Sequence, residues 1–280
     1  MKKFFKILGI IILAVVLIAA IVPYAFQSQI QESVKRYLNS NLNAKVDFSD
    51  VNLSFFRSFP RAQVDVYDLI ITNQAPFEGE TLATANSVSF NMSIKELFKN
   101  TEEEAMVVNS ITVDEALLTL KIDANGNENF DIVKPQDSTK PAKNFAFDIK
   151  QYEINNSALN YLDQTTGFQM QVTELDHTGR ARITSEISQL DTESKANLSL
   201  EIDSTSYLEN TKVRLSALID MDLDEQKYTF LENTGYINQL PLEFEGYFQQ
   251  LEDSQEMDIA FKNPESSFKS FLGILPEAYS

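Results

Sequence analysis

The chain contains no cysteine and no tryptophan, and its 280 residues include a single histidine, His177. Without cysteine it can form no disulfide, no thiolate nucleophile, no cysteine-ligated zinc site and no lipid-modified cysteine. One histidine also excludes a metal site built from several imidazoles. Glycine and proline are scarce, at eight each, so the chain is not of low complexity. We expect no cofactor and no metal.

Basic residues are also few, because the chain has 23 basic and 41 acidic residues. The three lysines at positions 2, 3 and 6 leave 20 basic against 41 acidic residues in the remainder. Binding to phosphate backbones or to anionic lipid headgroups needs a basic surface, so this charge argues against both, and we expect no nucleic-acid partner. The apolar share of 43% is large enough for a buried core and argues against disorder.

One long apolar run, residues 7–26, contains no charged residue. Twenty helical residues span about 30 Å, the thickness of the hydrocarbon layer of a membrane. Lysines precede the run and no Lys or Arg follows before Lys35, which places the N-terminus in the cytoplasm and the rest across the membrane. We predict a single-pass anchor. We assign Ile7, Ile12, Val16, Ile21 and Phe26 to this membrane anchor.

A cleaved signal peptide is the alternative to an anchor. The uninterrupted apolar stretch at residues 7–22 is longer than a usual signal-peptide core, and cleavage after Ala25 would put Pro23 at the minus-three position. Both features favour an uncleaved anchor.

Residues 27–44 predict an amphipathic helix, with Ile30, Val34, Tyr37 and Leu38 on one stripe. The period then changes to two, which is typical of strands. Val88, Phe90, Met92 and Ile94 form the clearest alternation, and residues 95–99 predict a helical turn after it. Further alternating stretches predict strands around residues 46–48, 51–55, 64–66, 69–71, 111–113, 118–122, 145–149, 159–161, 168–172, 181–183, 198–202, 213–221, 240–248 and 257–261.

The sequence also contains signals for the breaks and turns between the predicted strands. The change of parity near Ser49-Asp50 predicts a bulge, and Asn125-Gly126 predicts a hairpin turn. We divide the chain into a basic tail (1–6), the anchor (7–26), the helix (27–44), a first part of the sheet (45–133), a loop (134–144), a second part (145–266) and a terminal helix (267–280) that ends abruptly.

The predicted strands are apolar on one face and polar on the other. An apolar face of this size needs cover, and a second sheet, closure of the sheet on itself or a ligand could supply it. Few helices are predicted that could lie over it. The expected fold class is therefore mainly β: an N-terminal transmembrane helix is followed by a long curved, mostly antiparallel, trough-like sheet with a few short helices.

Three motifs carry weak chemical signals. Asp220, Asp222 and Asp224 lie on the outward parity of one strand, and a solvated strand face explains them better than calcium does. The stretch that begins at Asp123 superficially resembles a calcium-binding loop, but its Asn-Gly hairpin turn explains it better. His177 lies in a turn-like Asp-His-Thr-Gly stretch and is interpreted as a surface histidine, because neither a nucleophile nor an orienting acid can be named for it. No nucleophile elbow and no phosphate loop occurs, so we do not expect an enzyme.

Taken in order, several blocks of this chain resemble the AsmA-like proteins of Gram-negative envelopes. The blocks follow the anchor and helix and comprise residues 51–60, residues 64–73, Pro76-Phe77, residues 88–98, Gly126 with Asn129-Phe130, residues 159–163, residues 240–246, Phe261-Lys262 and Leu275-Pro276. Family members usually extend further, so we expect a truncated gene, a fragment or a short paralogue.

The resemblance implies a bridge-like lipid-transfer protein anchored in the inner membrane, with a periplasmic β-trough that delivers phospholipid toward the outer membrane. The expected partners are phospholipid, the inner membrane and other envelope proteins that extend the conduit. The alternative is a scaffold that modulates outer-membrane protein assembly and has a packed apolar face. The expected groove residues are Val88, Phe90, Met92, Leu118, Leu120, Phe147, Leu215 and Phe244.

Overall fold

The computed structural model describes residues 31–32, 35, 39, 42–55, 61–98, 107–132, 134, 149–183, 188–222, 225–251 and 254–264. In this part the chain forms twelve strands and one short 3-10 helix, and residues 31, 32, 35 and 39 are α-helical. In order they are β1 (Ala44–Asp47), β2 (Asp50–Ser54), β3 (Arg61–Asn73), β4 (Thr81–Ser93), η1 (Ile94–Phe98), β5 (Val108–Ile122), β6 (Gln151–Asp163), β7 (Phe168–Ile183), β8 (Ser188–Ile202), β9 (Thr205–Asp222), β10 (Lys227–Ile237), β11 (Leu240–Gln250) and β12 (Gln255–Lys262).

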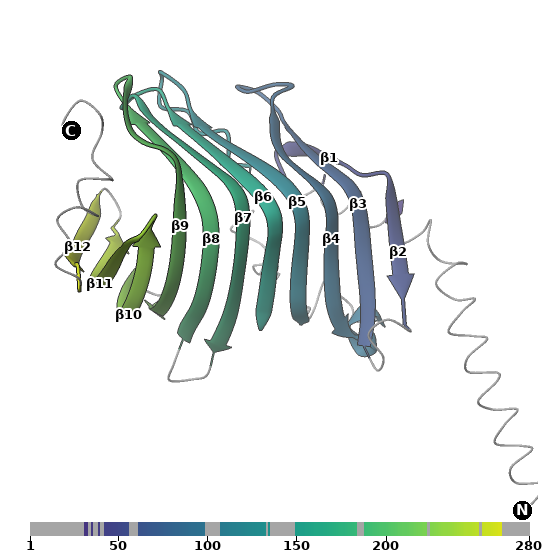
Figure 1. Cartoon of the computed structure of the whole chain (residues 1–280). Helices are drawn as coiled ribbons and strands as arrows, with labels where there is room; N and C mark the ends of the chain where they lie inside the picture. The colour runs from purple at the N-terminus through teal and green to yellow at the C-terminus, as the bar shows by residue number, and fades with distance from the viewer. Residues whose placement is uncertain are drawn as a thin grey trace, which may run out of the picture.

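All twelve strands belong to one open sheet. Its order from β3 to β12 follows the chain, and both β1 and β2 pair with β3 at one edge (Figure 1). Every pair is antiparallel except β5 and β6, which are parallel. The two ends of the sheet do not pair with each other. The expected long, mostly antiparallel sheet is therefore confirmed.

Several predicted features lie outside the described residues. They are the anchor positions Ile7, Ile12, Val16, Ile21 and Phe26, the strand position Phe147, and the terminal helix at 267–280. Among the residues that are described, no helix has the length and apolarity to cross a membrane.

The expected bulge at Ser49-Asp50 is instead a break between two strands. Strand β1 pairs with the end of β3 and β2 pairs with its beginning, so that Val46 faces Ile71 and Val51 faces Val66. The break allows Val46 and Val51, which have opposite parity, to enter the same cluster of buried side chains.

A line of positions with irregular backbone crosses the middle of the sheet, and register shifts mark bulges in it on β6, β7 and β9. Asp68, Glu115, Asn156, Glu174 and Asn210 lie on β3, β5, β6, β7 and β9, and all five have positive φ values between 43° and 51°. All five side chains are exposed. Asn and Asp tolerate this conformation best among residues with a Cβ, and a bulged residue of this kind bends its strand. The strands from β3 to β9 bend at about the same height in Figure 1. We call this line the crease.

Side chains satisfy backbone groups that the crease takes out of the regular ladder. The amide of Ala116 donates to Ser157 Oγ at 2.9 Å, and the amide of Asn156 donates to Asp176 Oδ1 at 3.0 Å. On β9 the amide of Asn210 donates to Ser199 Oγ at 2.9 Å. The sheet therefore bends without leaving these amides unpaired.

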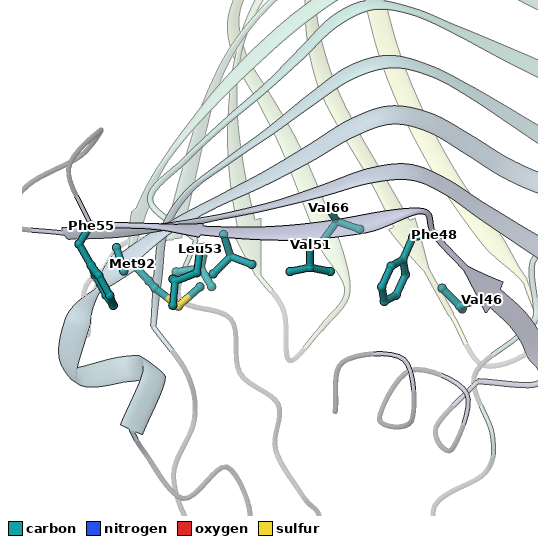
Figure 2. Close-up of a cluster of buried hydrophobic side chains, with 10 residues drawn as sticks. Val46, Phe48, Val51, Leu53, Phe55, Val66 and Met92 are labelled. Atoms are coloured by element: carbon teal, nitrogen blue, oxygen red, sulfur yellow. The ribbon is translucent and has the colours of Figure 1, made fainter. Parts of the chain in front are cut away.

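The most deeply buried part of the sheet is at its β1–β4 end. Its cluster contains Val46, Phe48, Val51, Leu53, Phe55, Ala62, Val64, Val66, Met92 and Val108. Figure 2 shows the labelled side chains on one side of the sheet, under the arch that the bent strands form. We call this the inner face and the opposite side the outer face.

Candidate functional site

One apolar row runs along the inner face, perpendicular to the strands. Direct cross-strand partners lie on the same face of a sheet, so the register traces the row from strand to strand. From β2 to β6 it consists of Val51, Val66, Val88, Val113 and Ile154. From β7 to β11 it continues through His177, Ser194, Leu215, Gly235 and Leu242. Only two of these ten positions carry polar side chains.

The neighbouring row belongs to the outer face and is polar throughout. It consists of Asn52, Asp65, Ser89, Thr112, Glu153, Thr178, Glu193, Ser216, Thr234, Glu243 and Lys262. The two rows lie one residue apart in every strand from β2 to β11. The sheet therefore has one apolar and one polar face over nearly its whole length.

Seven of the eight predicted groove residues are described, and all seven lie on the inner face. Val88, Phe90 and Met92 are neighbours on β4, where they face Val66, Val64 and Ala62 of β3. Leu118 and Leu120 lie beyond the crease on β5 and face Leu159 and Tyr161. Leu215 and Phe244 belong to β9 and β11.

The exposure of the inner face increases from one end of the sheet to the other. At the β1–β4 end, Val88 and Met92 are only 8% and 5% exposed, and Phe90 packs against the buried cluster. From β5 to β11, the apolar inner side chains are mostly half-buried. On β12, Met257 and Phe261 are 67% and 68% exposed. The β1–β4 end is thus filled by the chain's own side chains, whereas the remainder of the concave inner face stays partly exposed, and we call this part the groove.

Aromatic side chains line the groove at the β10–β12 end, and Phe244 is the one among them that was predicted as a groove residue. The ring centroids of Phe230 and Phe244 lie 5.7 Å apart, and those of Phe244 and Phe261 lie 6.0 Å apart. Tyr228 stacks on Phe248 at 6.4 Å. Rings at these separations attract each other and keep a broad apolar surface in place.

The groove is almost free of charge. Among the described strand residues that the register places on the inner face, none is Lys or Arg, and Asp163 is the one acid. Asp163 lies at the rim, where it accepts hydrogen bonds from the backbone and hydroxyl of Thr165 at 2.8 and 2.6 Å. The hydrogen bond from the Thr165 side chain lowers the pKa of the Asp163 carboxyl below its ordinary value. An apolar groove bordered by polar surface is suited to hydrocarbon.

A family model described as the AsmA family matches residues 1–248. The chain belongs to the AsmA family. The resemblance seen in the order of its sequence blocks is therefore confirmed. Neither the comparison with curated proteins nor the comparison with solved structures finds a match.

One block of this AsmA-family chain, Gly126 with Asn129-Phe130, has a clear structural role. Gly126 turns the chain after β5 with a φ of +82°, but only one isolated bridge follows, so the predicted Asn-Gly turn starts no second strand. Instead, the side chain of Asn129 accepts from the amide of Lys121 and donates to the carbonyl of Thr119, at 2.7 and 2.8 Å. Asn129 thereby forms hydrogen bonds with the edge of β5 at Thr119 and Lys121, beyond the last residue of β5 that pairs with β4.

His177 corrects the interpretation of a surface histidine in a turn. It lies in the middle of β7, half-buried on the inner face, where Nδ1 is 2.7 Å from Ser194 Oγ and Nε2 is 2.9 Å from the Tyr152 hydroxyl. Burial lowers the pKa of His177 and raises the pKa of Tyr152. Gly179, two residues on, suggested a turn, but here it makes room for the Tyr152 ring.

The described part of the chain shows no group of His, Asp or Glu side chains that could hold a metal ion. Asp220 and Asp222 are exposed on β9, and Asp224 lies outside the described residues. The carboxylate of Asp123 accepts from Asn125 and Asn127, which closes its turn. The described part of the chain therefore offers the apolar groove, rather than a metal centre, as its candidate site.

Proposed function

We propose that the inner face binds the acyl chains of phospholipids and shields them from water during transport toward the outer membrane. The observation that carries this proposal is the apolar row of the inner face, which stays half-exposed from β5 to β11. No second layer covers it among the described elements, since each strand packs on its neighbours in the sheet. A large apolar surface left in this state is typical of a binding site.

The physical requirement on such a groove is modest. Each methylene removed from water contributes about 0.8 kcal/mol, so one long acyl chain contributes on the order of 10 kcal/mol. The seven strands from β5 to β11, at about 4.8 Å each, make a groove roughly 30 Å long. That length accommodates an extended acyl chain. No bond has to be made or broken, and we infer that the protein is not an enzyme.

The proposed location follows from the sequence and the charge. Residues 7–26 anchor the protein in the inner membrane with its N-terminus in the cytoplasm, and the sheet lies in the periplasm. The excess of acidic over basic residues keeps the polar outer face away from anionic headgroups. Another envelope protein that extends the conduit would pair with β12, whose second edge faces no described strand.

The competing function is a scaffold without lipid, and the filled β1–β4 end of the inner face favours it. Phe244→Gln separates the two, because Phe244 is half-buried in the open part of the groove. The matched control is Glu245→Gln on the outer face of the same strand. The full-length variants are purified, and their bound phospholipid and thermal unfolding are measured.

A conduit predicts that Phe244→Gln loses most of the bound phospholipid while unfolding at nearly the wild-type temperature, and that the control behaves as wild type. A scaffold predicts no phospholipid on any of the three proteins and a clear loss of stability in Phe244→Gln. The second pattern would overturn the proposed function.

A further inference from the structure

One polar cluster interrupts the apolar inner face in the middle of the sheet. It is formed by Tyr152, His177 and Ser194, on the three adjacent strands β6, β7 and β8. The hydroxyl of Tyr152 lies 2.9 Å from His177 Nε2, and Ser194 Oγ lies 2.7 Å from His177 Nδ1. The rings of Tyr152 and His177 lie 5.3 Å apart between centroids. Val113 and Ile154 precede the cluster in its row, and Leu215 follows it.

Tyr152 packs closely against the neighbouring strand β7. Tyr152 faces Gly179 across the β6–β7 pair, and a Cβ at position 179 would come within 2.2 Å of the tyrosine ring. Thr192, the next residue in that row, is buried, and its hydroxyl donates to the carbonyl of Ala217. The Tyr152 ring therefore lies against the backbone of Gly179, and the His177 ring lies between the Tyr152 hydroxyl and Ser194 Oγ.

The cluster contains one more hydrogen-bond donor than its own hydrogen bonds use. A neutral histidine has one N–H, so the three side chains offer three donors for two hydrogen bonds. If Tyr152 donates to Nε2, then Nδ1–H donates to Ser194 and the serine O–H is left over. If Ser194 donates to Nδ1, then Nε2–H donates to Tyr152 and the tyrosine O–H is left over. In either tautomer one hydroxyl donor remains for an acceptor in the groove.

The charge of the surroundings decides which acceptor is suitable. Burial favours the neutral form of His177. The described strands place no Lys or Arg on the inner face, and Arg180, Lys195 and Arg214 are exposed and belong to the outer parity. A phosphate would thus meet no counter-charge here, whereas a neutral carbonyl oxygen needs only one donor.

We propose that Tyr152, His177 and Ser194 form a hydrogen-bonding site for the ester carbonyl of a glycerolipid whose acyl chains lie in the groove. The site rests on the proposed function and adds a chemical preference to it. The ester group lies between the acyl chain and the headgroup, so this site would fix where along the groove a lipid stops, with the headgroup toward the rim.

The test compares two phospholipids with the same headgroup and chain length, one with ester and one with ether linkages. Binding to the full-length protein is measured by competition in an alkyl maltoside, a detergent without an ester carbonyl. The wild type is expected to prefer the ester lipid by a factor of about 5, the equivalent of one neutral hydrogen bond. Equal affinities in the wild type would overturn the proposal, and failure to bind either lipid would overturn the proposed function itself.

The variant needed is the triple substitution Tyr152→Phe, His177→Leu and Ser194→Ala. Removing fewer groups still leaves one free N–H or O–H, whereas removing all three leaves an apolar surface of similar shape. This variant is expected to lose the preference and to retain the affinity for the ether lipid. A preserved preference, or an equal loss of both lipids, contradicts the proposal. Thr178→Val with Ser216→Ala, on the outer face of β7 and of the nearby strand β9, is the matched control and keeps the preference.

A second measurement uses the wild type alone and therefore does not depend on the folding of the variant. The ester carbonyls of the bound lipid are labelled with carbon-13, and their infrared stretch is recorded. A low-frequency, hydrogen-bonded component whose position differs from that of the water-bonded carbonyls in detergent without protein is the expected result. A bound lipid whose carbonyls show no hydrogen-bonded component would overturn the site.

Discussion

The ring of Tyr152 lies over Gly179, so that a Cβ at position 179 would come 2.2 Å from the ring. We predict that Gly179→Ala displaces the tyrosine and lowers the free energy of unfolding by about 1–3 kcal/mol, the usual cost of overpacking. Urea unfolding measures this loss. In a Tyr152→Ala background the ring is gone, and the same substitution should then cost less than about 0.5 kcal/mol. Equal costs in both backgrounds would show that the contact does not matter.

Met92 and Met257 test the difference between the two ends of the inner face. Both are methionines on this face, but Met92 is 5% exposed and Met257 is 67% exposed. Truncating a buried methionine to alanine costs about 2–5 kcal/mol, and an exposed substitution changes stability by about 0.5 kcal/mol or less. Chemical unfolding of Met92→Ala and Met257→Ala should show this difference. Similar costs would mean that the β12 end is as tightly packed as the β1–β4 end.

The crease can be tested at Glu115, where the backbone has a φ of +51°. A β-branched residue is poorly tolerated in this conformation, so Glu115→Val should destabilise the protein by about 1–2 kcal/mol. Thr112→Val on the same strand, where the backbone is regular, should be nearly neutral. Thermal unfolding of the two variants compares them directly. A neutral Glu115→Val would indicate that the strand is regular at this point.

His177 gives a clean test of burial, because it is the single histidine of the chain. Burial lowers the pKa of His177 below its ordinary value of 6.5, so the unfolded chain binds more protons than the folded chain between the two values. The stability that His177 contributes is therefore complete above pH 6.5 and is lost as the pH falls through the lower, folded pKa. NMR titration of the ring protons, with the urea-unfolded chain as the reference, measures both values. A folded pKa equal to or above the unfolded one would contradict a buried, neutral ring.

The alternation of apolar and polar residues predicted most of the sheet correctly. On β4 the positions Val88, Phe90 and Met92 lie on one face as expected, because each residue of a regular strand reverses the direction of its side chain. The same rule places Leu215 and Phe244 on that face. It could not show that Val88 and Met92 are buried, since burial depends on which segments pack against them.

The crease explains where sequence reasoning divided strands that are continuous. On β5, Ile111 and Val113 have one parity and Leu118 and Leu120 the other, which predicts two strands. The positive φ of Glu115 reverses the parity within one strand, and no residue type signals it reliably. Strand β10 was missed for a related reason, because its register shifts after Phe230 and its inner positions then include Asn233 and Gly235.

The polar cluster was missed because its members are far apart in the sequence. Tyr152, His177 and Ser194 come together only through the pairing of three strands, and His177 was assigned to a turn on account of Gly179. Extending the alternation of Ala181 and Ile183 back to His177 would have placed it on the apolar parity, because the parity of β7 reverses at Glu174. That assignment would have shown the interruption of the apolar row, although not its hydrogen bonds.

The central claim is that lipid occupies the inner face of the open part of the sheet. The most direct measurement is in-cell photocrosslinking of full-length protein with a photoreactive residue at Leu215 or at its neighbour Ser216, followed by mass spectrometry of the product. We predict phospholipid adducts at Leu215 and none at Ser216, because the two side chains lie on opposite faces of β9. A folded protein that gives no adduct at Leu215, or equal adducts at both positions, would contradict the account.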